Sequence, residues 1–217
     1  MATIIRSVID DPEWLVVALH GYGDDGASFA HHVAEAADGH RVAVVGPDGP
    51  APAELAPTGR AWYPMTGRPD TMGRRASKVA RTVGQRIVAT QAELGIPARR
   101  TAVIAFSQGT TVASALLDRD LCARVALLCG RLTATPRRRP PELLVVTGSE
   151  DRFVPPSAVA SDVADADLEA VTAHYTIDGL GHTVSATVTA LAVRFAVGAE
   201  HVRAGHHMVT SLVANRQ

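Results

Sequence analysis

Three residue types that cooperate in nucleophilic catalysis occur in this chain in the order Ser107, Asp151, His182. A serine hydroxyl attacks a carbonyl carbon poorly until a base takes its proton, and histidine suits that role near neutral pH. A carboxylate beside the histidine holds the ring in the required tautomer and stabilises the imidazolium that forms. If the fold brings these side chains together, they predict acyl transfer through a serine.

Ser107 stands on what the sequence predicts to be a sharp turn between a strand and a helix. The apolar residues 103–106 favour a strand, and a helical pattern opens at Gln108. Such a turn leaves room only for small side chains two positions before and two positions after the serine. Ala105 and Gly109 fill these positions, whereas the common form of the motif has glycine at both. The extra methyl group of Ala105 makes the predicted turn tight.

Asp151 and His182 each have a plainer interpretation. Asp151 could be a turn or helix N-terminal aspartate, and the neighbouring Glu150 is a rival acid. His182, one of nine histidines, could be an ordinary turn residue after Gly181. Both alternatives lose weight when the surrounding elements are considered, because all three residues follow predicted strands.

Short apolar runs bounded by turn signals predict strands, and apolar residues at helical spacing predict helices. The predicted strands cover residues 14–19, 41–45, 103–106, 124–128, 143–147 and 170–177, with a weak edge strand within 2–9. The predicted helices cover residues 27–37, 72–94, 108–117, 156–166 and 184–197. This alternation predicts an α/β fold with a mostly parallel sheet of six to seven strands and helices on both faces. Reactive groups gather at the carboxyl ends of the strands in such a sheet.

Length and composition set the remaining limits. We expect a single domain over residues 1–217, with its core at about 14–198 and a tail at 199–217. A hydrophobic content of 47%, a charged content of 20% and a formal net charge of −1 give no basic excess for nucleic acid. The run 137–139 of three arginines is interpreted as a solvated loop. Cys122 and Cys129 lack a disulfide or metal-ligand pattern, so we expect reduced, buried thiols and no metal.

The two ends of the chain bear on location and partners. Arg6, Asp10 and Asp11 interrupt the apolar segment that a signal peptide would need. No apolar run approaches the roughly 20 residues of a membrane helix, so we expect a cytoplasmic protein without a membrane span. The tail 200–217 could be a further helix, an exposed arm or a partner contact, and a homodimer is left open.

Two loops follow predicted strands. The loop His20–Gly26 has three glycines that leave backbone N–H groups unobstructed, although a plain strand-to-helix connection is the alternative. The loop 48–71 shows no periodicity, and a loop of that length in a compact domain is usually functional or disordered. Trp62 and Tyr63 in its middle favour an ordered loop, in which they line a pocket or plug the edge of the core.

Several of these segments together resemble the carboxylesterase/phospholipase group of α/β-hydrolases, which includes bacterial carboxylesterases and acyl-protein thioesterases. The resemblance spans about residues 14 to 198 and implies an α/β-hydrolase fold. It is carried by Leu19–Asp24 (LHGYGD), Ala61–Tyr63 (AWY), Ala105–Gly109 (AFSQG), Asp151–Pro155 (DRFVP) and Gly181–His182.

The resemblance implies a role for each site residue. Ser107 is the expected nucleophile, His182 the general base and Asp151 the residue that orients the histidine. The backbone N–H groups of Tyr22 and Gln108 are the expected oxyanion hole. An acyl transfer develops negative charge on the carbonyl oxygen, and preorganised donors at that point are worth roughly 3 kcal/mol each.

The chain also departs from the group's pattern after the nucleophile. Thr110 and Thr111 stand where the group commonly has glycine or alanine, so we expect the helix slightly farther from the strand.

The longest insertion, residues 48–71, is too short for a large cap domain, which predicts an open cleft. The apolar side chains expected to line that cleft are Phe29, Trp62, Tyr63, Met65, Phe153 and Val154. Such walls favour small or medium acyl groups over a charged substrate.

The sequence thus predicts a serine hydrolase that cleaves a small-molecule carboxylic ester and needs no metal or organic cofactor. A thioesterase or lysophospholipase, or a hydrolase or lyase of a biosynthetic pathway, would use the same residues. From a different class, a catalytically silent α/β-hydrolase could act as a binding module, but three competent residues weigh against it.

Overall fold

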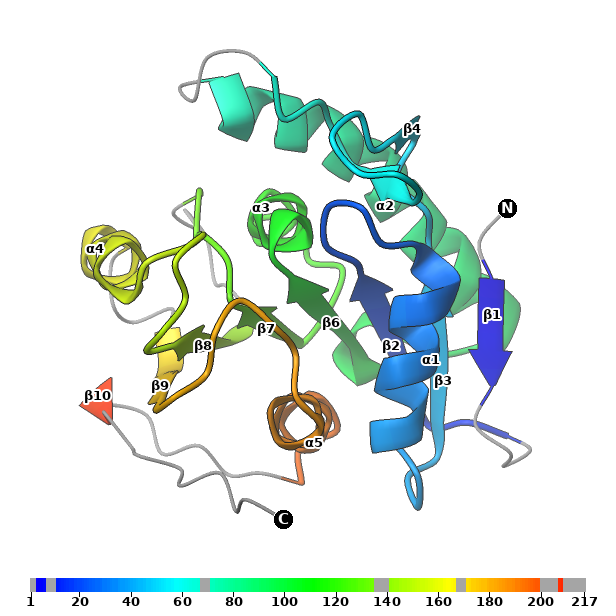
Figure 1. Cartoon of the computed structure of the whole chain (residues 1–217). Helices are drawn as coiled ribbons and strands as arrows, with labels where there is room; N and C mark the ends of the chain where they lie inside the picture. The colour runs from blue at the N-terminus through cyan, green and yellow to red at the C-terminus, as the bar shows by residue number, and fades with distance from the viewer. Residues whose placement is uncertain are drawn as a thin grey trace.

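The fold is built on one sheet of eight strands with helices on both sides (Figure 1). The computed structural model describes residues 3–6, 11–66, 71–134, 141–166, 171–199 and 207–208. The strands of the sheet, in spatial order, are β1 (Thr3–Arg6), β3 (Val42–Gly46), β2 (Trp14–Leu19), β6 (Thr101–Phe106), β7 (Arg124–Leu128), β8 (Glu142–Gly148), β9 (Val171–Ile177) and β10 (His207–Met208).

The six strands from β3 to β9 are all parallel. At the edges, β1 runs antiparallel to β3 and the two-residue β10 runs parallel to β9. The prediction of a mostly parallel sheet is therefore confirmed. The central strand begins two residues earlier than residues 103–106, because Thr101 and Ala102 pair with Leu15 and Val16 of β2.

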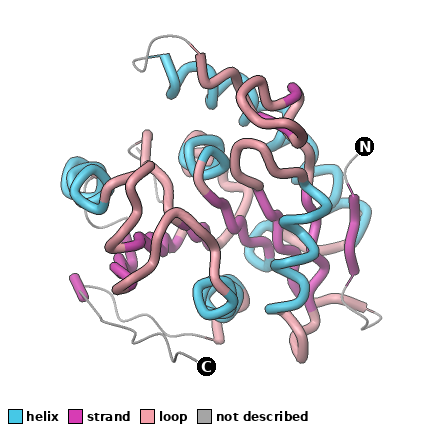
Figure 2. The backbone as a smooth tube through the Cα atoms, viewed as in Figure 1, coloured by secondary structure: helices cyan, strands magenta, loops and turns pink. Residues whose placement is uncertain are grey.

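The helices form two layers, which Figures 1 and 2 show on opposite sides of the sheet. One layer contains α1 (Gly26–Ala36) and α5 (Ala186–Ala196). The other contains α2 (Met72–Leu94), α3 (Gln108–Ser114) and α4 (Pro156–Asp165). Each layer closes its own buried cluster of apolar side chains against one face of the sheet. Because both faces are covered, the central strands are apolar at almost every position rather than at alternate ones.

Two predicted segments take a more specific form. The loop 48–71 carries a small antiparallel pair, β4 (Ala51–Pro52) and β5 (Arg60–Ala61), so its described part is ordered rather than structureless. The expected helix 108–117 ends at Ser114 and continues in turns. The turn Ala98–Arg100 is a short 3-10 helix. Apart from Ala199 and the strand β10, the tail 199–217 lies outside the described residues.

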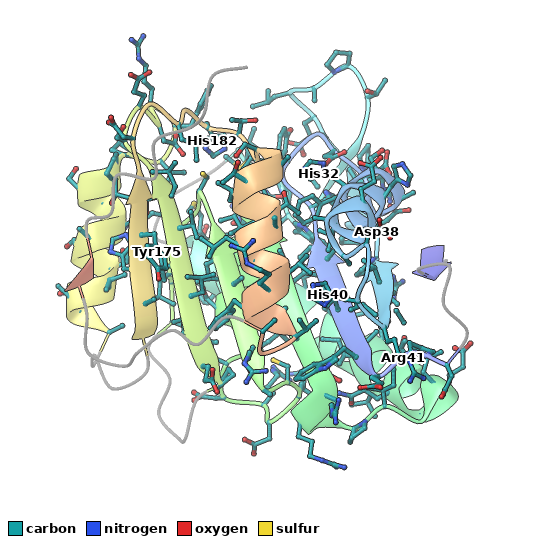
Figure 3. All side chains as sticks on the ribbon, turned by 90° about the horizontal axis from the view of Figure 1, so that it is seen from below. His32, Asp38, His40, Arg41, Tyr175 and His182 are labelled. Carbon is teal, nitrogen blue, oxygen red and sulfur yellow. The ribbon has the colours of Figure 1, made fainter. Side chains whose placement is uncertain are left out.

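The parallel strands bring the predicted reactive residues to one edge. Ser107 follows β6 directly, Asp151 follows β8 and His182 follows β9. Figure 3 shows His182 at the opposite end of the molecule from Arg41, which precedes β3. The carboxyl ends of the strands therefore form the edge at which chemistry is expected.

Candidate active site

Ser107 sits on a strained turn between β6 and α3. Its backbone has φ 49° and ψ −115°, a conformation that non-glycine residues rarely adopt. The Ser107 N–H donates to the Leu128 carbonyl over 3.0 Å. A Cβ at Gly109 would lie 2.3 Å from the Leu19 carbonyl oxygen, so only glycine fits there. Ala105 is fully buried, and its methyl group is accommodated.

The side chains of Ser107, His182 and Asp151 form one chain of hydrogen bonds. Ser107 Oγ lies 2.8 Å from His182 Nε2. His182 Nδ1 lies 2.7 Å from Asp151 Oδ2. A carboxylate can only accept, so the proton of the neutral ring sits on Nδ1 and leaves Nε2 free to accept from the serine hydroxyl. This is the tautomer that a general base beside a serine needs.

Asp151, rather than Glu150, faces the histidine. Asp151 is 3% exposed, and its Oδ1 accepts the N–H groups of Phe153 and Val154 at 2.9 and 2.8 Å. These bonds leave Oδ2 for His182 and fix the direction of the carboxylate. Glu150 is exposed. The tight turn after β8 therefore decides between the two neighbouring acids.

Two aromatic rings lie beside the imidazole of His182, and a cysteine lies against the backbone of the turn that carries it. The rings of Phe106 and Phe153 have their centroids 5.2 and 5.3 Å from it. Cys129 lies beneath the histidine turn, with Sγ 3.5 Å from the Thr183 carbonyl oxygen. Burial raises the pKa of Cys129 to about 12, so its thiol is neutral and serves as a weak donor. The prediction of buried thiols holds for Cys129, whereas Cys122 is only partly buried. The sequence did not indicate the place of Cys129 behind the histidine.

The expected oxyanion donors lie beside the serine. Gln108 is the first residue of α3, and Tyr22 belongs to the glycine-rich loop after β2. Within the described part of the chain, neither backbone N–H donates to a protein acceptor. A Cβ built on Gly21 would lie 3.5 Å from the Ser107 Cβ, so the loop runs against the nucleophile. Two unpaired donors next to a serine can hold a developing negative charge.

A pocket of about 210 Å³ opens in front of Ser107 and Gln108. Four of the six predicted wall residues line it: Tyr63, Met65, Phe153 and Val154. The other lining residues are Tyr22, Met72, Thr111, Arg131 and Pro155, which sequence reasoning did not assign to the wall. Tyr22 and Pro155 lie in motifs that the sequence analysis used for other roles, whereas no local signal marked Met72, Thr111 and Arg131 as wall residues.

Arg131 brings a charge to this wall, but the charge is balanced. Its guanidinium forms a two-point ion pair with Asp162 of α4, with Nη2 2.6 Å from Oδ1. The hydrogen bond to Asp162 raises the pKa of Arg131 above its usual value. The pocket therefore combines apolar walls with a paired cation rather than a free one.

Phe29 and Trp62 do not line the pocket, unlike the sequence-based expectation. Phe29 is 3% exposed on the sheet-facing side of α1, with its ring centroid 6.4 Å from that of Phe106. Trp62 is 1% exposed and stacks on His20, with ring centroids 4.8 Å apart. Of the pair in the loop 48–71, Trp62 fills the core edge and Tyr63 faces the pocket. Both offered interpretations of the pair are thus realised, one by each residue.

The two threonines after the nucleophile have specific partners. Thr110 Oγ1 donates to the carbonyl oxygens of Ser107 and Arg131 at 2.7 and 3.0 Å. Thr111 Oγ1 lies 2.7 Å from the Tyr63 hydroxyl. A Cβ at Gly130 would lie 2.2 Å from Thr110 Oγ1, so glycine makes room for this threonine. Beside them α3 approaches β2 closely at Gly109.

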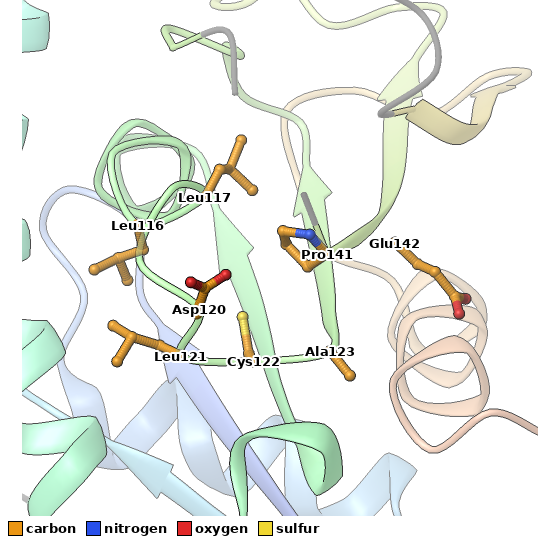
Figure 4. Close-up of a pocket in the computed structure, with 8 residues that line it drawn as sticks. All are labelled: Leu116, Leu117, Asp120, Leu121, Cys122, Ala123, Pro141 and Glu142. Carbon is orange, nitrogen blue, oxygen red and sulfur yellow. The ribbon is translucent and has the colours of Figure 1, made fainter. Parts of the chain in front are cut away.

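Two other hollows lie away from the serine. One, of about 370 Å³, is lined by residues at the amino ends of β7 and β8, including Cys122 and Asp120 (Figure 4). The other lies between α2 and the loop that holds Trp62. Across the described residues, no group of three histidine, cysteine or acidic side chains could hold a metal ion. None of the helices described is long and apolar enough to cross a membrane.

Comparison with solved structures places the fold among known esterases. The structure of esterase PE8 is 22% identical with a TM-score of 0.77, covering 89% of this chain and 96% of that one. A carboxylesterase from Bacillus cereus is 15% identical with a TM-score of 0.68, covering 92% and 94%. Acyl-protein thioesterase 2 from Zea mays is 16% identical with a TM-score of 0.67, covering 90% and 96%.

The sequence itself carries the family assignment. The model of the phospholipase/carboxylesterase family matches residues 2–140, which is more than half of the chain. The match includes the turn of Ser107 and the loop of Tyr22, while Asp151 and His182 lie beyond it. The chain therefore belongs to the phospholipase/carboxylesterase family of α/β-hydrolases.

Proposed function

We propose that this protein is a serine carboxylic-ester hydrolase that works through an acyl-enzyme on Ser107. The observation that carries the proposal is the unbroken hydrogen-bond chain from Ser107 Oγ to His182 and on to the buried Asp151. A serine can attack a carbonyl carbon when its hydroxyl is hydrogen-bonded to the unprotonated Nε2 of a histidine and lies at the mouth of an apolar pocket.

In the proposed first half-reaction, Ser107 Oγ forms a bond to the ester carbonyl carbon while His182 Nε2 takes the hydroxyl proton. The carbonyl oxygen becomes an oxyanion that the N–H groups of Tyr22 and Gln108 stabilise. When the tetrahedral intermediate collapses, the ester C–O bond breaks and His182 returns its proton to the leaving alcohol. Asp151 stabilises the imidazolium between these two transfers.

In the second half-reaction, water takes the place of the alcohol. His182 removes a proton from the water as the water oxygen attacks the acyl carbon. The bond to Ser107 Oγ then breaks, Oγ regains the proton from His182, and the carboxylic acid leaves. None of these proposed steps requires an oxidant, a reductant or a metal ion.

The pocket supports a short or medium neutral acyl group. Met65, Met72 and Val154 give it apolar walls, and Arg131 is already paired with Asp162. A thioester presents the same acyl carbon with a different leaving group, and one structural neighbour is named an acyl-protein thioesterase. Thioester cleavage is therefore the second candidate function. Comparing kcat/KM for a butyrate ester with kcat/KM for the matching butyrate thioester distinguishes the two candidates.

The decisive experiment is turnover of p-nitrophenyl butyrate together with labelling by a fluorophosphonate probe. We expect wild-type protein to do both and Ser107→Ala to do neither. Ser157→Ala, on the exposed side of α4, is the matched control and should behave as wild type. If the wild-type protein neither turns over the ester nor reacts with the probe, a catalytically silent binding protein becomes the better description.

A further inference from the structure

Arg131 is a charged residue in the wall of the candidate active-site pocket, and the proposed reaction does not use it. It comes three residues after the end of β7 and lines the pocket together with Ser107. Its side chain is 41% exposed, whereas the side chain of its partner Asp162 is only 12% exposed. Arg131 is therefore open to the pocket while it contacts a largely buried acid.

The backbone around Arg131 is fixed from two directions. Thr110 Oγ1 donates to the Ser107 carbonyl over 2.7 Å and to the Arg131 carbonyl over 3.0 Å. The Leu132 N–H donates to Asp162 Oδ2 over 3.1 Å. One threonine thus ties this segment to the turn of the proposed nucleophile, and one acid ties it to α4. These bonds fix the place from which the arginine side chain starts.

The ion pair with Asp162 uses only part of the Arg131 guanidinium. Arg131 donates through Nε to Asp162 Oδ2 and through Nη2 to Asp162 Oδ1. A guanidinium carries five N–H donors in one plane, so three are left, two on Nη1 and one on Nη2. Within the part of the chain that the structure describes, these three have no acceptor. Because Nε and Nη2 face the acid, Nη1 points away from it.

Three neighbouring polar side chains of the wall have already used their donors. Gln108 Nε2 lies 2.8 Å from the Tyr63 carbonyl oxygen and 3.4 Å from Met65 Sδ, which engages both of its N–H groups. Thr111 Oγ1 donates to the Gln108 carbonyl and lies 2.7 Å from the Tyr63 hydroxyl. A threonine hydroxyl has one proton, so the tyrosine donates to the threonine. Among these four described residues, Arg131 is the one with donors left for a bound molecule.

The charge of Asp162 decides which acceptor suits these donors. A substrate carboxylate would be attracted by the guanidinium of Arg131 and repelled by the carboxylate of Asp162 beside it, and the two effects offset each other. A neutral carbonyl or hydroxyl oxygen meets no such repulsion and still accepts an N–H. Met65 and Val154 supply apolar walls for the methylene groups that would carry such an oxygen. The ion pair thus adds a polar contact without net charge to an apolar pocket.

We propose that Arg131 is a specificity-determining residue: its free N–H groups bind a neutral oxygen in the acyl chain, so that oxo- or hydroxy-substituted acyl groups are preferred over alkyl groups of the same length. This inference rests on the proposed function, because it names the substrate class of the same site. The Arg131 side chain is 41% exposed, so water satisfies its donors when an alkyl chain is bound. The preference is therefore about tenfold in kcat/KM, near the lower end of what a hydrogen bond to a charged group contributes.

Three matched p-nitrophenyl esters test this preference. The hexanoate has a plain alkyl chain, the 5-oxohexanoate has a neutral oxygen, and the glutarate monoester has a carboxylate at the same carbon. After subtraction of spontaneous hydrolysis, we expect kcat/KM of the wild-type protein to be about tenfold higher for the 5-oxohexanoate than for the hexanoate, and no higher for the glutarate monoester than for the hexanoate. Equal values for the oxo and alkyl esters, or a preference for the carboxylate, would overturn the proposal.

A double variant assigns the preference to Arg131. Arg131→Met together with Asp162→Asn removes the donors without leaving an unpaired acid, and the asparagine oxygen can still accept from Leu132. We expect the ratio of kcat/KM for the oxo ester to kcat/KM for the alkyl ester to fall to about one. Arg152→Met is the matched control, because Arg152 is exposed and does not line the pocket, and it should keep the wild-type ratio. A ratio that survives in the double variant would refute the role of Arg131.

The single variant Asp162→Asn tests the opposing charge and does not require the loss of Arg131. The guanidinium keeps its donors but loses the neighbouring negative charge. We therefore expect kcat/KM for the glutarate monoester to rise roughly fivefold relative to the hexanoate, while the preference for the oxo ester remains. An unchanged glutarate ratio would contradict the argument that Asp162 makes this contact selective for neutral oxygen.

Binding to Ser107→Ala separates a failure of this inference from a failure of the proposed function. In a ¹H–¹⁵N NMR titration, methyl 5-oxohexanoate should bind about tenfold more tightly than methyl hexanoate and should shift the Nε resonance of Arg131. If the wild-type protein lacks esterase activity but Ser107→Ala shows this preference, the proposed function fails and the role of Arg131 in binding stands. If the wild-type protein is an active esterase and the preference is absent, only the role of Arg131 fails.

Discussion

The two ends of the sheet each carry a hollow, and the two hollows differ in chemistry as well as in size. The hollow at the amino ends of the strands is the larger, at about 370 Å³ against about 210 Å³ at the carboxyl ends. Both mix apolar and polar side chains. At the carboxyl ends, however, the polar groups from β6, β8 and β9 converge in hydrogen bonds, whereas Cys122 at the amino ends has no hydrogen-bond partner among the described residues.

The comparison between Ser107 and Cys122 shows what a nucleophile requires. A thiol is intrinsically the better nucleophile, but only as thiolate. Burial raises the pKa of Cys122 to about 12, so the thiolate is negligible at neutral pH. Ser107, the proposed nucleophile, has the weaker group, but its Oγ lies 2.8 Å from Nε2 of His182, the proposed base. In the proposed mechanism, positioned partners therefore matter more than the residue type or the volume of the hollow.

After the loss of the serine itself, the largest expected effect comes from Asp151, the acid of the candidate active site. Asp151→Asn should keep the geometry but disfavour the required tautomer of His182, lowering kcat about 10³–10⁴-fold. The exposed neighbour provides the matched control, and Glu150→Gln should stay within about twofold of wild type. Steady-state kinetics on p-nitrophenyl butyrate measure both. Comparable losses in the two variants would mean that the turn after β8 does not select Asp151.

Filling each hollow with a bulky side chain contrasts the two ends directly. Met65 lines the carboxyl-end pocket and is 49% exposed, so Met65→Trp should fold and reduce room for the acyl group. We expect the ratio of kcat/KM for a hexanoate ester to kcat/KM for an acetate ester to fall roughly tenfold. That is the size of effect expected when a pocket no longer accommodates one or two methylene groups. Ala123→Trp, in the amino-end hollow, should leave the ratio unchanged. A changed ratio in Ala123→Trp would assign that hollow a part in substrate binding.

Thiol reactivity extends the comparison to the cysteines. Burial raises the pKa of both Cys122 and Cys129 to about 12. We expect neither to be alkylated by iodoacetamide within an hour at pH 8 in the folded protein, and both to be alkylated in guanidinium chloride. Intact-mass spectrometry counts the added groups. Rapid modification of Cys122 in the native protein would show that the amino-end hollow admits reagents and activates its thiol.

The smallest expected effect is a pH dependence of stability from His20. Burial lowers its pKa in the folded state, so the unfolded chain binds the extra proton more readily. Its contribution to the free energy of unfolding should be complete above about pH 6.5 and decrease as the pH falls below that value. The unfolding temperature should therefore fall less steeply between pH 8 and pH 5 in His20→Asn than in wild type. Parallel pH curves for the two proteins would rule out this contribution.

Much of the fold followed from local patterns. The strand Trp14–Leu19, the helix Met72–Leu94 and the strand Arg124–Leu128 have the predicted bounds, because long apolar runs and a glycine at Gly95 mark them clearly. The C-terminal end of α3 was harder to predict than its start at Gln108, which has the predicted position. The helix stops at Ser114 although helical residues continue, since the chain must turn there to reach β7.

For the candidate site, sequence determined the residue types and the order in which they occur. Ser107, Asp151 and His182 could be named because a parallel sheet places strand ends at one edge. The resemblance favoured Asp151, but the residues alone left Glu150 as a rival acid, because the choice depends on which carboxylate the turn buries.

Only the tertiary structure decided which side chains face one another. Trp62 and Tyr63 are adjacent aromatic residues with the same local signal, yet one stacks on His20 in the core and the other lines the pocket. The ring of His20, the side-chain amide of Gln108 and the guanidinium of Arg131 took their roles from partners far away in the sequence. Local sequence encodes backbone periodicity and turn geometry, whereas the surroundings of a side chain depend on how distant segments pack.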